Sequence, residues 1–374
     1  MTPPLLIERV GVHVVDLPLV RPFTTAYGTI TSRRSLLVRV EDADGATGWG
    51  EAPIPDRPSY SAETVESAWE VLTRWLLPSV VSVRLSSPAE GLARTQMQGN
   101  NFAKHAFESA LWTLASASSG IPLRELLGGV RDAVPVGESF GIPEDRQVET
   151  LLEEIGPRLS EGFGRMKIKI EPGWDAGVLR AVASAFPDVP LTADGNCAFD
   201  AGDPGPWEEI DELGLVMIEQ PLPGDDVVGM AALQTRVRTP LCLDETATSP
   251  GITAAAIELG AGRIVNIKPA RLGGIGASVA VHNLCRERGV PVWCGGLLET
   301  GIGRGVNLAI ASLPNFTLHA DMSPSRLFYA EDLVDPTFDV QPDGTVRVPT
   351  EPGVGFAVAE DRIAACETRR WVMP

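Results

Sequence analysis

Five charged residues stand at the ends of five successive apolar runs in the middle of this chain. About 25 residues, the length of one strand–helix unit, separate each of them from the next. A single acid at such a place is usually a helix cap or a solvated loop charge. Five in phase indicate one shared site, because the carboxyl ends of parallel strands in a barrel surround one mouth. These residues are Lys169, Asp194, Glu219, Asp244 and Lys268.

Three of the five are carboxylates on neighbouring predicted strands: Asp194, Glu219 and Asp244. Three oxygen ligands of this kind suit Mg²⁺ or Mn²⁺, with water and substrate completing an octahedron. Without a cation, three clustered carboxylates would repel one another and raise one another's pKa. The spacing therefore predicts a site for Mg²⁺ or Mn²⁺.

Lysines stand on both sides of this predicted metal site. Lys167 and Lys169 alternate along one strand, so their side chains point the same way, and one can abstract a proton while the other orients a carboxylate. Lys268 lies across the barrel and can reach the opposite face of a planar intermediate. Removing a proton next to a carboxylate leaves an enediolate with two negative charges, which a divalent cation stabilises. Lysines with a lowered pKa on both faces are the bases that a racemase requires.

The elements that must position these residues are eight short apolar runs, which alternate with amphipathic helical stretches. Alternating strands and helices imply a parallel sheet, and eight units permit closure into a barrel. A doubly wound sheet would need a glycine-rich GxGxxG turn after its first strand, and residues 137–141 do not supply one. The runs are residues 134–136, 166–170, 190–193, 215–218, 240–243, 264–267, 291–294 and 316–318.

The chain before this repeat is typical of an α+β unit. Residues 5–17 and 35–41 alternate as strands do, and residues 42–45 form a turn. We predict that Ser61 caps a first helix and that a second helix covers residues 101–118. The last part of the chain leaves the repeat, and we expect it to pack back on the N-terminal unit. The expected domains are residues 1–125, 126–330 and 331–374.

Composition excludes several classes of function. The formal net charge of −18 opposes binding to nucleic acid. No apolar run reaches the roughly 18–20 residues that span a bilayer, and no secretory signal is evident at the N-terminus, so we expect a cytoplasmic protein. The five cysteines show no CxxC spacing, which argues against a disulfide framework or a zinc cluster, and the four histidines form no HExxH pair.

Several motifs resemble those of the muconate-lactonizing-enzyme subgroup of the enolase superfamily. Residues 167–169 resemble its KxK motif and residues 266–271 its second-lysine motif. Other matches narrow the resemblance to the o-succinylbenzoate synthase / N-succinylamino acid racemase family and extend it over nearly the whole chain. The metal-ligand motifs correspond to residues 194–196, 219–221 and 244–246, and the narrowing stretches to residues 170–175, 292–296, 298–304 and 311–318.

This resemblance implies a modified (β/α)7β barrel of the TIM type with an N-terminal α+β capping domain. It also implies roles: the three carboxylates would bind Mg²⁺ or Mn²⁺, Lys169 and Lys268 would be bases on opposite faces, and Lys167 would orient the substrate carboxylate. Arg271 could lower the pKa of Lys268. Three further residues are expected to contact the metal ligands and the lysines without touching the substrate: Asn196, Glu245 and Arg271.

In this family two loops of the capping domain cover the barrel mouth and choose the substrate, and residues 18–23 and 58–61 fall where those loops should be. The family commonly has Ala at position 195 and Ser at position 246, where this chain has Gly195 and Thr246; neither change removes a ligand. The expected substrate-binding residues are Phe23, Tyr60, Ser139, Gly296, Leu298 and Glu299.

Two reactions of the family begin with the same proton abstraction from a small-molecule carboxylate. The synthase dehydrates a cyclohexadiene carboxylate on the route to menaquinone, and the racemase inverts an N-acylated amino acid. A dipeptide epimerase, a muconate cycloisomerase or a Schiff-base barrel lyase using Lys169 or Lys268 are the alternatives. The lyase would leave the three carboxylates unexplained. We also expect a homo-oligomer.

Overall fold

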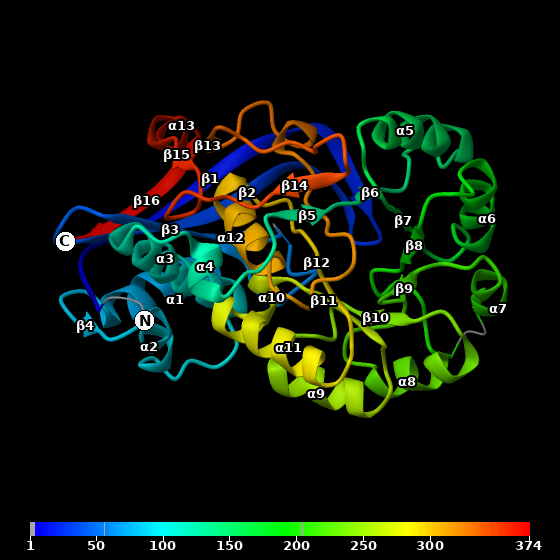
Figure 1. Ribbon diagram of the computed structural model, residues 1–374, viewed down its shortest axis with the longest axis horizontal. Helices are drawn as coiled ribbons and strands as arrows, with labels where there is room; N and C mark the ends of the chain where they lie inside the picture. The colour runs from blue at the N-terminus through cyan, green and yellow to red at the C-terminus, as the bar shows by residue number, and fades with distance from the viewer. Residues whose placement is uncertain (1–3, 56, 203–204) are drawn as a thin grey trace.

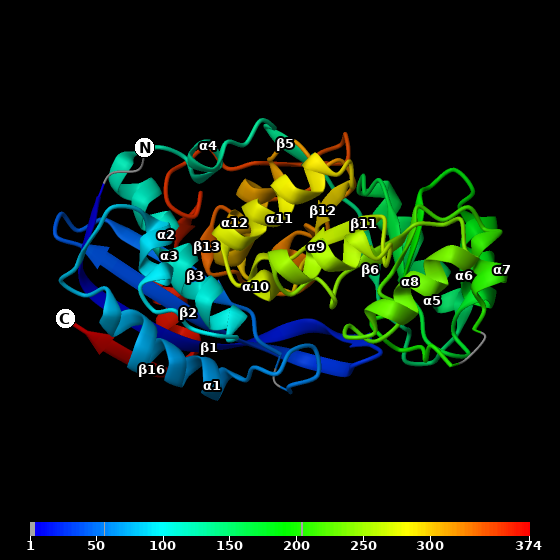
Figure 2. The ribbon, with the colours of Figure 1, turned by 90° about the horizontal axis from the view of Figure 1, so that it is seen from below.

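The computed structural model describes residues 4–55, 57–202 and 205–374 of the chain (Figure 1). Residues 1–3, on which the expectation of no secretory signal partly depends, lie outside the described residues. A strand-rich N-terminal unit lies beside a curled parallel sheet with helices on its outside (Figures 1 and 2). No helix in the described part of the chain is long and apolar enough to cross a membrane.

The N-terminal unit is an antiparallel sheet with helices packed on one face. Its strand order is β16-β1-β2-β3, with β4 paired to β1. Apolar side chains alternate inward along β1 and β2 and form a core with α1 and α3. The strands are β1 (Leu5–Thr25), β2 (Gly28–Asp42), β3 (Thr47–Ala52), β4 (Arg84–Leu85) and β16 (Glu367–Met373). The helices are α1 (Val65–Val71), α2 (Pro88–Ala93), α3 (Asn101–Ser119) and α4 (Leu123–Leu127).

Two details of this unit follow from local chemistry. Helix α1 begins after Thr64, whose hydroxyl accepts from the Ser67 amide, so the expectation that Ser61 caps this helix is wrong. Helix α3 crosses β3 at very close range. A Cβ on Gly50 would lie 2.0 Å from the Ala106 carbonyl oxygen, and only glycine permits this approach. The chain's last strand, β16, pairs antiparallel with β1.

The second unit is a seven-stranded, all-parallel sheet, as far as the described residues show, in the order β12-β11-β10-β9-β8-β7-β6. Its strands are buried on both faces, which explains their short and nearly continuous apolar runs. The strands are β6 (Glu138–Phe140), β7 (Met166–Lys169), β8 (Leu191–Asp194), β9 (Met217–Glu219), β10 (Leu241–Leu243), β11 (Ile264–Ile267) and β12 (Val292–Cys294).

Helices connect these strands along the outside of the sheet. They are α5 (Val148–Ser160), α6 (Ala176–Ala185), α7 (Trp207–Asp211), α8 (Val227–Arg236), α9 (Pro250–Glu258), α10 (Pro269–Leu272), α11 (Ile275–Glu287) and α12 (Gly301–Ala311). The C-terminal part adds β13 (Val334–Asp335), β14 (Thr345–Arg347), β15 (Ala357–Val358) and α13 (Glu360–Cys366). The predicted fold class, an α/β barrel of the TIM type with an N-terminal cap, is confirmed.

The first and eighth predicted strands differ from expectation. Residues 134–136 do not enter the parallel sheet as a strand; β5 (Ala133–Pro135) pairs antiparallel with β14, and the first barrel strand is β6. Apolar content misled the prediction, because β6 carries the buried polar residue Glu138. Residues 316–318 form no regular strand, but the ring is closed nearby. Val292 bridges Phe316, and the Gly137 amide donates to the Ala320 carbonyl oxygen at 3.0 Å.

Candidate active site

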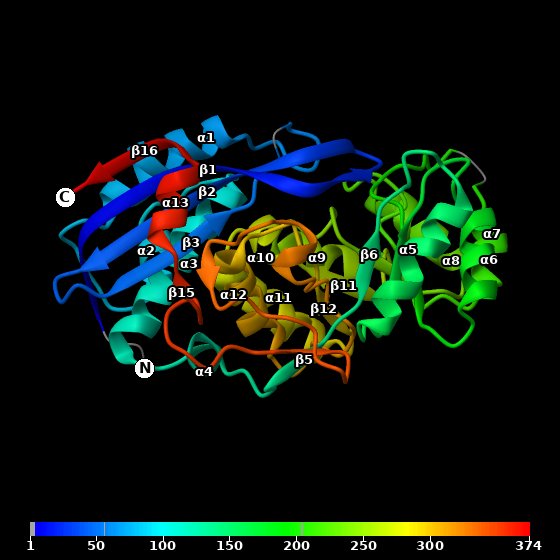
Figure 3. The same ribbon diagram turned by 90° about the horizontal axis from the view of Figure 1, so that it is seen from above.

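A cavity of about 380 Å³ lies at the carboxyl ends of the barrel strands, below the N-terminal unit. The β1–β2 hairpin reaches across the barrel toward β6 and forms part of its roof (Figure 3). Barrel strands and the loops after them form its floor. The lining includes Phe23, Tyr27 and Tyr60 from the cap, and Ser139, Lys167, Lys169, Asn196, Lys268, Gly296, Leu298, Arg304 and Asp321 from the barrel.

Five of the six residues expected to bind substrate line this cavity: Phe23, Tyr60, Ser139, Gly296 and Leu298. The sixth expected residue does not lie on the cavity wall. Glu299 is buried behind it, 3.3 Å from the Arg304 guanidinium and accepting from the Asn307 amide at 3.0 Å. Its position suits it to hold Arg304, and any influence on substrate would pass through that arginine.

Strand register explains why the predicted catalytic residues meet. Lys169 on β7 is the direct neighbour of Asp194 on β8, which in turn is the neighbour of Glu219 on β9. The Lys169 ammonium donates to Asp194 at 2.6 Å. The Lys167 ammonium lies 3.2 Å from Asp194 and 3.1 Å from Glu219. Residues far apart in sequence are therefore joined by ion pairs at one end of the sheet.

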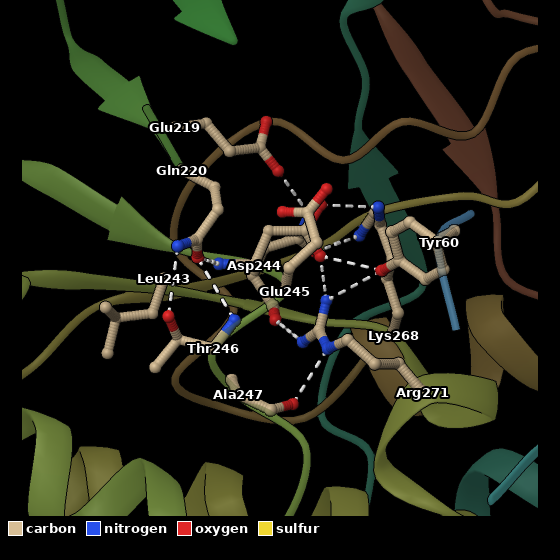
Figure 4. Close-up of polar contacts among 12 residues, drawn as sticks. Tyr60, Glu219, Gln220, Leu243, Asp244, Glu245, Thr246, Ala247, Lys268 and Arg271 are labelled. Carbon is tan, nitrogen blue, oxygen red and sulfur yellow. Dashed lines mark hydrogen bonds and ion pairs between the residues drawn. The ribbon is translucent and has the colours of Figure 1, made fainter. Parts of the chain in front are cut away.

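The next strand brings the second lysine to the same network. Asp244 directly follows β10 and accepts from Lys268 at 2.7 Å and from the Tyr60 hydroxyl at 2.9 Å. Arg271 also forms an ion pair with Asp244. Figure 4 shows these three side chains converging on one carboxylate. Gln220 fixes the backbone of Asp244, because the Gln220 side-chain oxygen accepts a hydrogen bond from the Asp244 amide at 3.0 Å.

Burial and charge shift the titration of this network in opposite directions. Burial, together with the charge of Asp194, raises the pKa of Glu219 to about 8. Burial disfavours the ionised forms of Asp194 and Asp244. The adjacent lysines outweigh this effect and hold the pKa of both carboxyls well below the ordinary value. For Lys268, burial disfavours the ammonium, yet Asp244 raises the lysine pKa well above its usual range. The expectation that the pKa of Lys268 is lowered is therefore wrong for this arrangement, in which Asp244 accepts from its ammonium.

The donor set fits a hard divalent cation in its chemistry. Asp194, Glu219 and Asp244 supply buried carboxylate oxygens from three adjacent strands, and the raised pKa of Glu219 shows that they lie close enough to repel. Among the described residues, no three Asp, Glu, His or Cys side chains converge closely enough to hold an ion. Ammonium groups of Lys167, Lys169 and Lys268 supply the positive charge at these oxygens.

The three residues expected to support the site do contact it. The Asn196 side-chain oxygen accepts from Lys169 at 2.6 Å, and its amide nitrogen donates to Glu245 at 3.3 Å. Burial and the charge of Asp244 raise the pKa of Glu245 to about 7. Arg271 is buried and not part of a surface salt bridge; it donates to the Ala247 carbonyl oxygen at 2.7 Å.

Sequence reasoning missed three residues of the cavity. Asp321 lies 2.6 Å from both Lys167 and Arg165, so it is a further carboxylate partner of the KxK lysine. It follows the eighth predicted run, where the rule that identified the other strand-end acids would have found it. Tyr27 and Arg304 carried no such signal, because one lies in a hairpin turn and the other within helix α12.

The fold and these contacts define a barrel enzyme with acid–base groups gathered at the carboxyl ends of its strands. Family models agree: residues 9–128 match the mandelate racemase / muconate lactonizing enzyme N-terminal domain, and residues 150–362 match the enolase C-terminal domain-like model. The chain therefore belongs to the mandelate racemase / muconate lactonizing enzyme family of the enolase superfamily, which confirms the resemblance found in the sequence. Enzymes of this family generally use a divalent metal and act on small-molecule carboxylates.

Individual relatives are similar over most of their length. The chain is 44% identical to an o-succinylbenzoate synthase of Geobacillus kaustophilus, over 94% of this chain and 93% of that protein. It is 42% identical to an N-succinylamino acid racemase of Amycolatopsis, over 98% and 99% of the two chains. A solved enolase-superfamily structure from Listeria innocua superposes with a TM-score of 0.94 at 32% identity and covers 99% of each chain.

Proposed function

We propose that this enzyme removes the proton next to a substrate carboxylate, and that it acts as an N-succinylamino acid racemase and an o-succinylbenzoate synthase. The observation that carries the proposal is the placement of Lys169 and Lys268. They come from β7 and the end of β11, four strands apart in an eight-membered ring, and both line one cavity. The substrate's planar intermediate would lie between them. Relatives with both names support the choice of substrates.

The residues of the chain divide the reaction between them. Lys167, held by Asp321 at 2.6 Å and by Glu219 at 3.1 Å, is placed to bind and orient the substrate carboxylate. Lys169 takes the α-proton from one face, and Lys268 delivers a proton to the other face in the racemase reaction. In the synthase reaction one lysine serves first as base and then as acid for the departing hydroxyl.

A divalent cation, which we propose to be Mg²⁺ or Mn²⁺ bound by Asp194, Glu219 and Asp244, would stabilise the charge that develops on the carboxylate oxygens. The lysine ammonium groups would be displaced from these oxygens, because a divalent ion competes with a singly charged ammonium for the same carboxylates. Residues 18–23 lie in strand β1 and not in a loop as expected; Phe23 on β1 and Tyr60 in the segment after β3 line the cavity and would limit the access of water. The homo-oligomer expected from the sequence stays a prediction.

The decisive experiment measures kcat/KM for both substrate types with the same preparation. The purified enzyme, supplied with Mn²⁺ or Mg²⁺, is given the cyclohexadiene carboxylate precursor of o-succinylbenzoate and a set of N-succinylamino acids. A Lys169→Ala/Lys268→Ala variant is the control for contaminating activity. Turnover of either substrate type that this variant lacks supports proton abstraction by these lysines. Turnover of only a dipeptide or muconate would contradict the proposal.

A further inference from the structure

The β1–β2 hairpin ends in a two-residue turn that places a tyrosine over the barrel mouth. Thr25 pairs with Gly28 across the turn, so Ala26 and Tyr27 form its tip. The Tyr27 amide donates to the Thr25 hydroxyl at 3.1 Å, which fixes the turn. The tip lies above the barrel strands, far from the stem of the hairpin (Figures 2 and 3).

The Tyr27 hydroxyl crosses from the cap to the barrel. It donates to one carboxylate oxygen of Glu245 at 2.9 Å, and the same oxygen accepts from the Asn196 side-chain amide at 3.3 Å. The Asn196 side-chain oxygen in turn accepts from the Lys169 ammonium at 2.6 Å. Three successive hydrogen bonds therefore connect the hairpin tip to one of the two bases.

The Tyr27 ring makes a different connection. It packs edge-on against Tyr60, with ring centroids 6.1 Å apart and an interplanar angle of 89°. The Lys268 ammonium lies 5.0 Å from the centre of the Tyr60 ring, a cation–π distance. Through its ring, Tyr27 supports the neighbourhood of the second base, while through its hydroxyl it supports the first.

We propose that Tyr27 is a positioning residue whose hydroxyl latches the hairpin closed and holds Lys169, through Glu245 and Asn196, at the angle needed for proton transfer. Glu245 needs such a donor, because its other carboxylate oxygen is buried without a hydrogen-bond partner. Asn196 depends on the same contact, since its side-chain amide donates to that Glu245 oxygen at 3.3 Å. Loss of the hydroxyl alone should therefore weaken one base more than the other.

The test compares Tyr27→Phe, which removes only the hydroxyl, with Thr29→Val. Thr29 shares the hairpin tip and bonds the Thr24 hydroxyl at 2.8 Å, so its variant loosens the tip without touching Glu245. Hydrogen–deuterium exchange should show about tenfold faster amide exchange over residues 23–30 in Tyr27→Phe, with the stem of the hairpin unchanged. Exchange at the wild-type rate would overturn the latch.

The second measurement rests on the proposed function. Proton NMR in D₂O follows washout of the α-proton from each pure enantiomer of an N-succinylamino acid, and single lysine variants identify the enantiomer that faces Lys169. In Tyr27→Phe we expect about tenfold slower washout from that enantiomer relative to the other. Thr29→Val should slow both equally. Equal slowing in Tyr27→Phe would overturn the positioning role. If the wild-type enzyme exchanges neither enantiomer, the racemase function fails instead, and the hydrogen-exchange result still decides the latch.

Discussion

Buried carboxylates occur in two regions of this molecule, and they are neutralised in different ways. The first region is the seam between the N-terminal unit and helices α11 and α12. There Glu51, on β3, accepts from the backbone amides of Thr300 and Gly303 at 3.1 and 3.0 Å. Glu108, on α3, accepts from the Gly276 amide at 3.2 Å. Each carboxylate caps the positive end of a barrel helix.

The second region is the barrel mouth, where the partners are cationic side chains. Asp194 meets Lys169 at 2.6 Å and Lys167 at 3.2 Å, and Asp244 meets Lys268 at 2.7 Å. A lysine ammonium sits on a flexible stem and can move when another cation or a substrate competes for its carboxylate. The backbone amides of a helix end cannot move in this way. The lysine–carboxylate ion pairs of the mouth can therefore be exchanged for contacts with a metal or substrate. The hydrogen bonds between carboxylates and backbone amides at the seam stay in place.

A glycine at the seam shows how closely the helix end and its carboxylate are packed. A Cβ on Gly274, which precedes α11 at a φ of +135°, would lie 1.9 Å from a Glu108 carboxylate oxygen. Any other residue there would push the carboxylate off the helix end. The mouth has the opposite design, because Asp194 and Asp244 each contact more than one cationic side chain. Removing one partner leaves another in place.

Removal of metal should have the largest effect and should act only on the mouth. Treatment with a chelator is expected to lower kcat by at least about 10⁴-fold, since several kcal/mol of charge stabilisation are lost. Added Mg²⁺ or Mn²⁺ should restore activity. The hydrogen bonds of the seam should persist, because the seam contains no predicted ligand. Unchanged turnover in excess chelator, after confirmed metal removal, would show that the three carboxylates do not serve a metal.

Removing the two bases separately should show that each lysine acts on one face of the substrate. Lys268→Ala is expected to lower racemisation of both enantiomers by roughly 10³-fold. It should still allow Lys169 to exchange the α-proton of the one enantiomer it faces. Lys169→Ala should show the reverse. Both variants should fold, because Asp244 keeps Arg271 and Tyr60, and Asp194 keeps Lys167.

Proton NMR in D₂O with each pure enantiomer measures this division. The synthase reaction should suffer in both variants, since the second ammonium stabilises the anionic intermediate. Exchange of both enantiomers at the wild-type rate in either single variant would contradict the assignment of one base to each face. A uniform loss of exchange with both enantiomers in both variants would do so as well.

The two regions also differ in how far the sequence predicts them. The mouth was predictable because chemistry recurs there in phase with the strands: Lys169, Asp194 and Glu219 occupy the same level of neighbouring strands. The seam gave no such signal. Glu51 and Glu108 are single acids in a strand and a helix, and their partners are backbone amides 249 and 168 residues away. Backbone groups carry no sequence signature, so contacts of this kind appear only in the folded chain.

The same limit applied to the roof of the cavity and the ends of the barrel. Phe23 and Tyr60 were found through a family motif, but Tyr27 lies in a hairpin turn whose reach depends on the length and twist of two long strands. The first barrel strand was misplaced because its buried polar residue, Glu138, hides the apolar pattern. Its pKa is raised to about 7 by burial, while the Ser323 hydroxyl donates to it at 2.5 Å.

A titration experiment tests the contacts of the seam and leaves those of the barrel mouth unchanged. Burial raises the pKa of Glu108 from 4.5 to about 7, so the folded state favours the protonated carboxyl. The stability that this group contributes is fully present below pH 4.5 and is lost as the pH rises through 7. Glu108→Gln removes the titration and keeps an oxygen acceptor. Between pH 4.5 and 8 the wild type should lose up to about 3 kcal/mol relative to the variant.

Denaturant unfolding of both proteins across this pH range gives the difference. Because the change is confined to the seam, kcat/KM at a fixed pH should differ little between the two proteins. A stability difference that is constant with pH would mean that Glu108 keeps its ordinary pKa, and that the α11 helix end fully compensates for its burial. A large loss of activity at unchanged stability would mean that the seam also shapes the mouth.

The smallest effect is expected at the roof, which joins the two regions. The Phe23 ring lines the cavity and packs edge-on against Phe328 at 6.5 Å, with no bond to a predicted metal ligand. Phe23→Ala should therefore change the ratio of kcat/KM between large and small N-succinylamino acids by about tenfold, the usual value of one apolar contact. Affinity for Mn²⁺, measured by calorimetry, should stay the same. Tyr60→Ala is the informative contrast, because the Tyr60 hydroxyl donates to Asp244 at 2.9 Å and its loss should disturb metal affinity as well as substrate preference. Equal loss of Mn²⁺ affinity in both variants would show that the roof is part of the mouth and not a separate layer that selects the substrate.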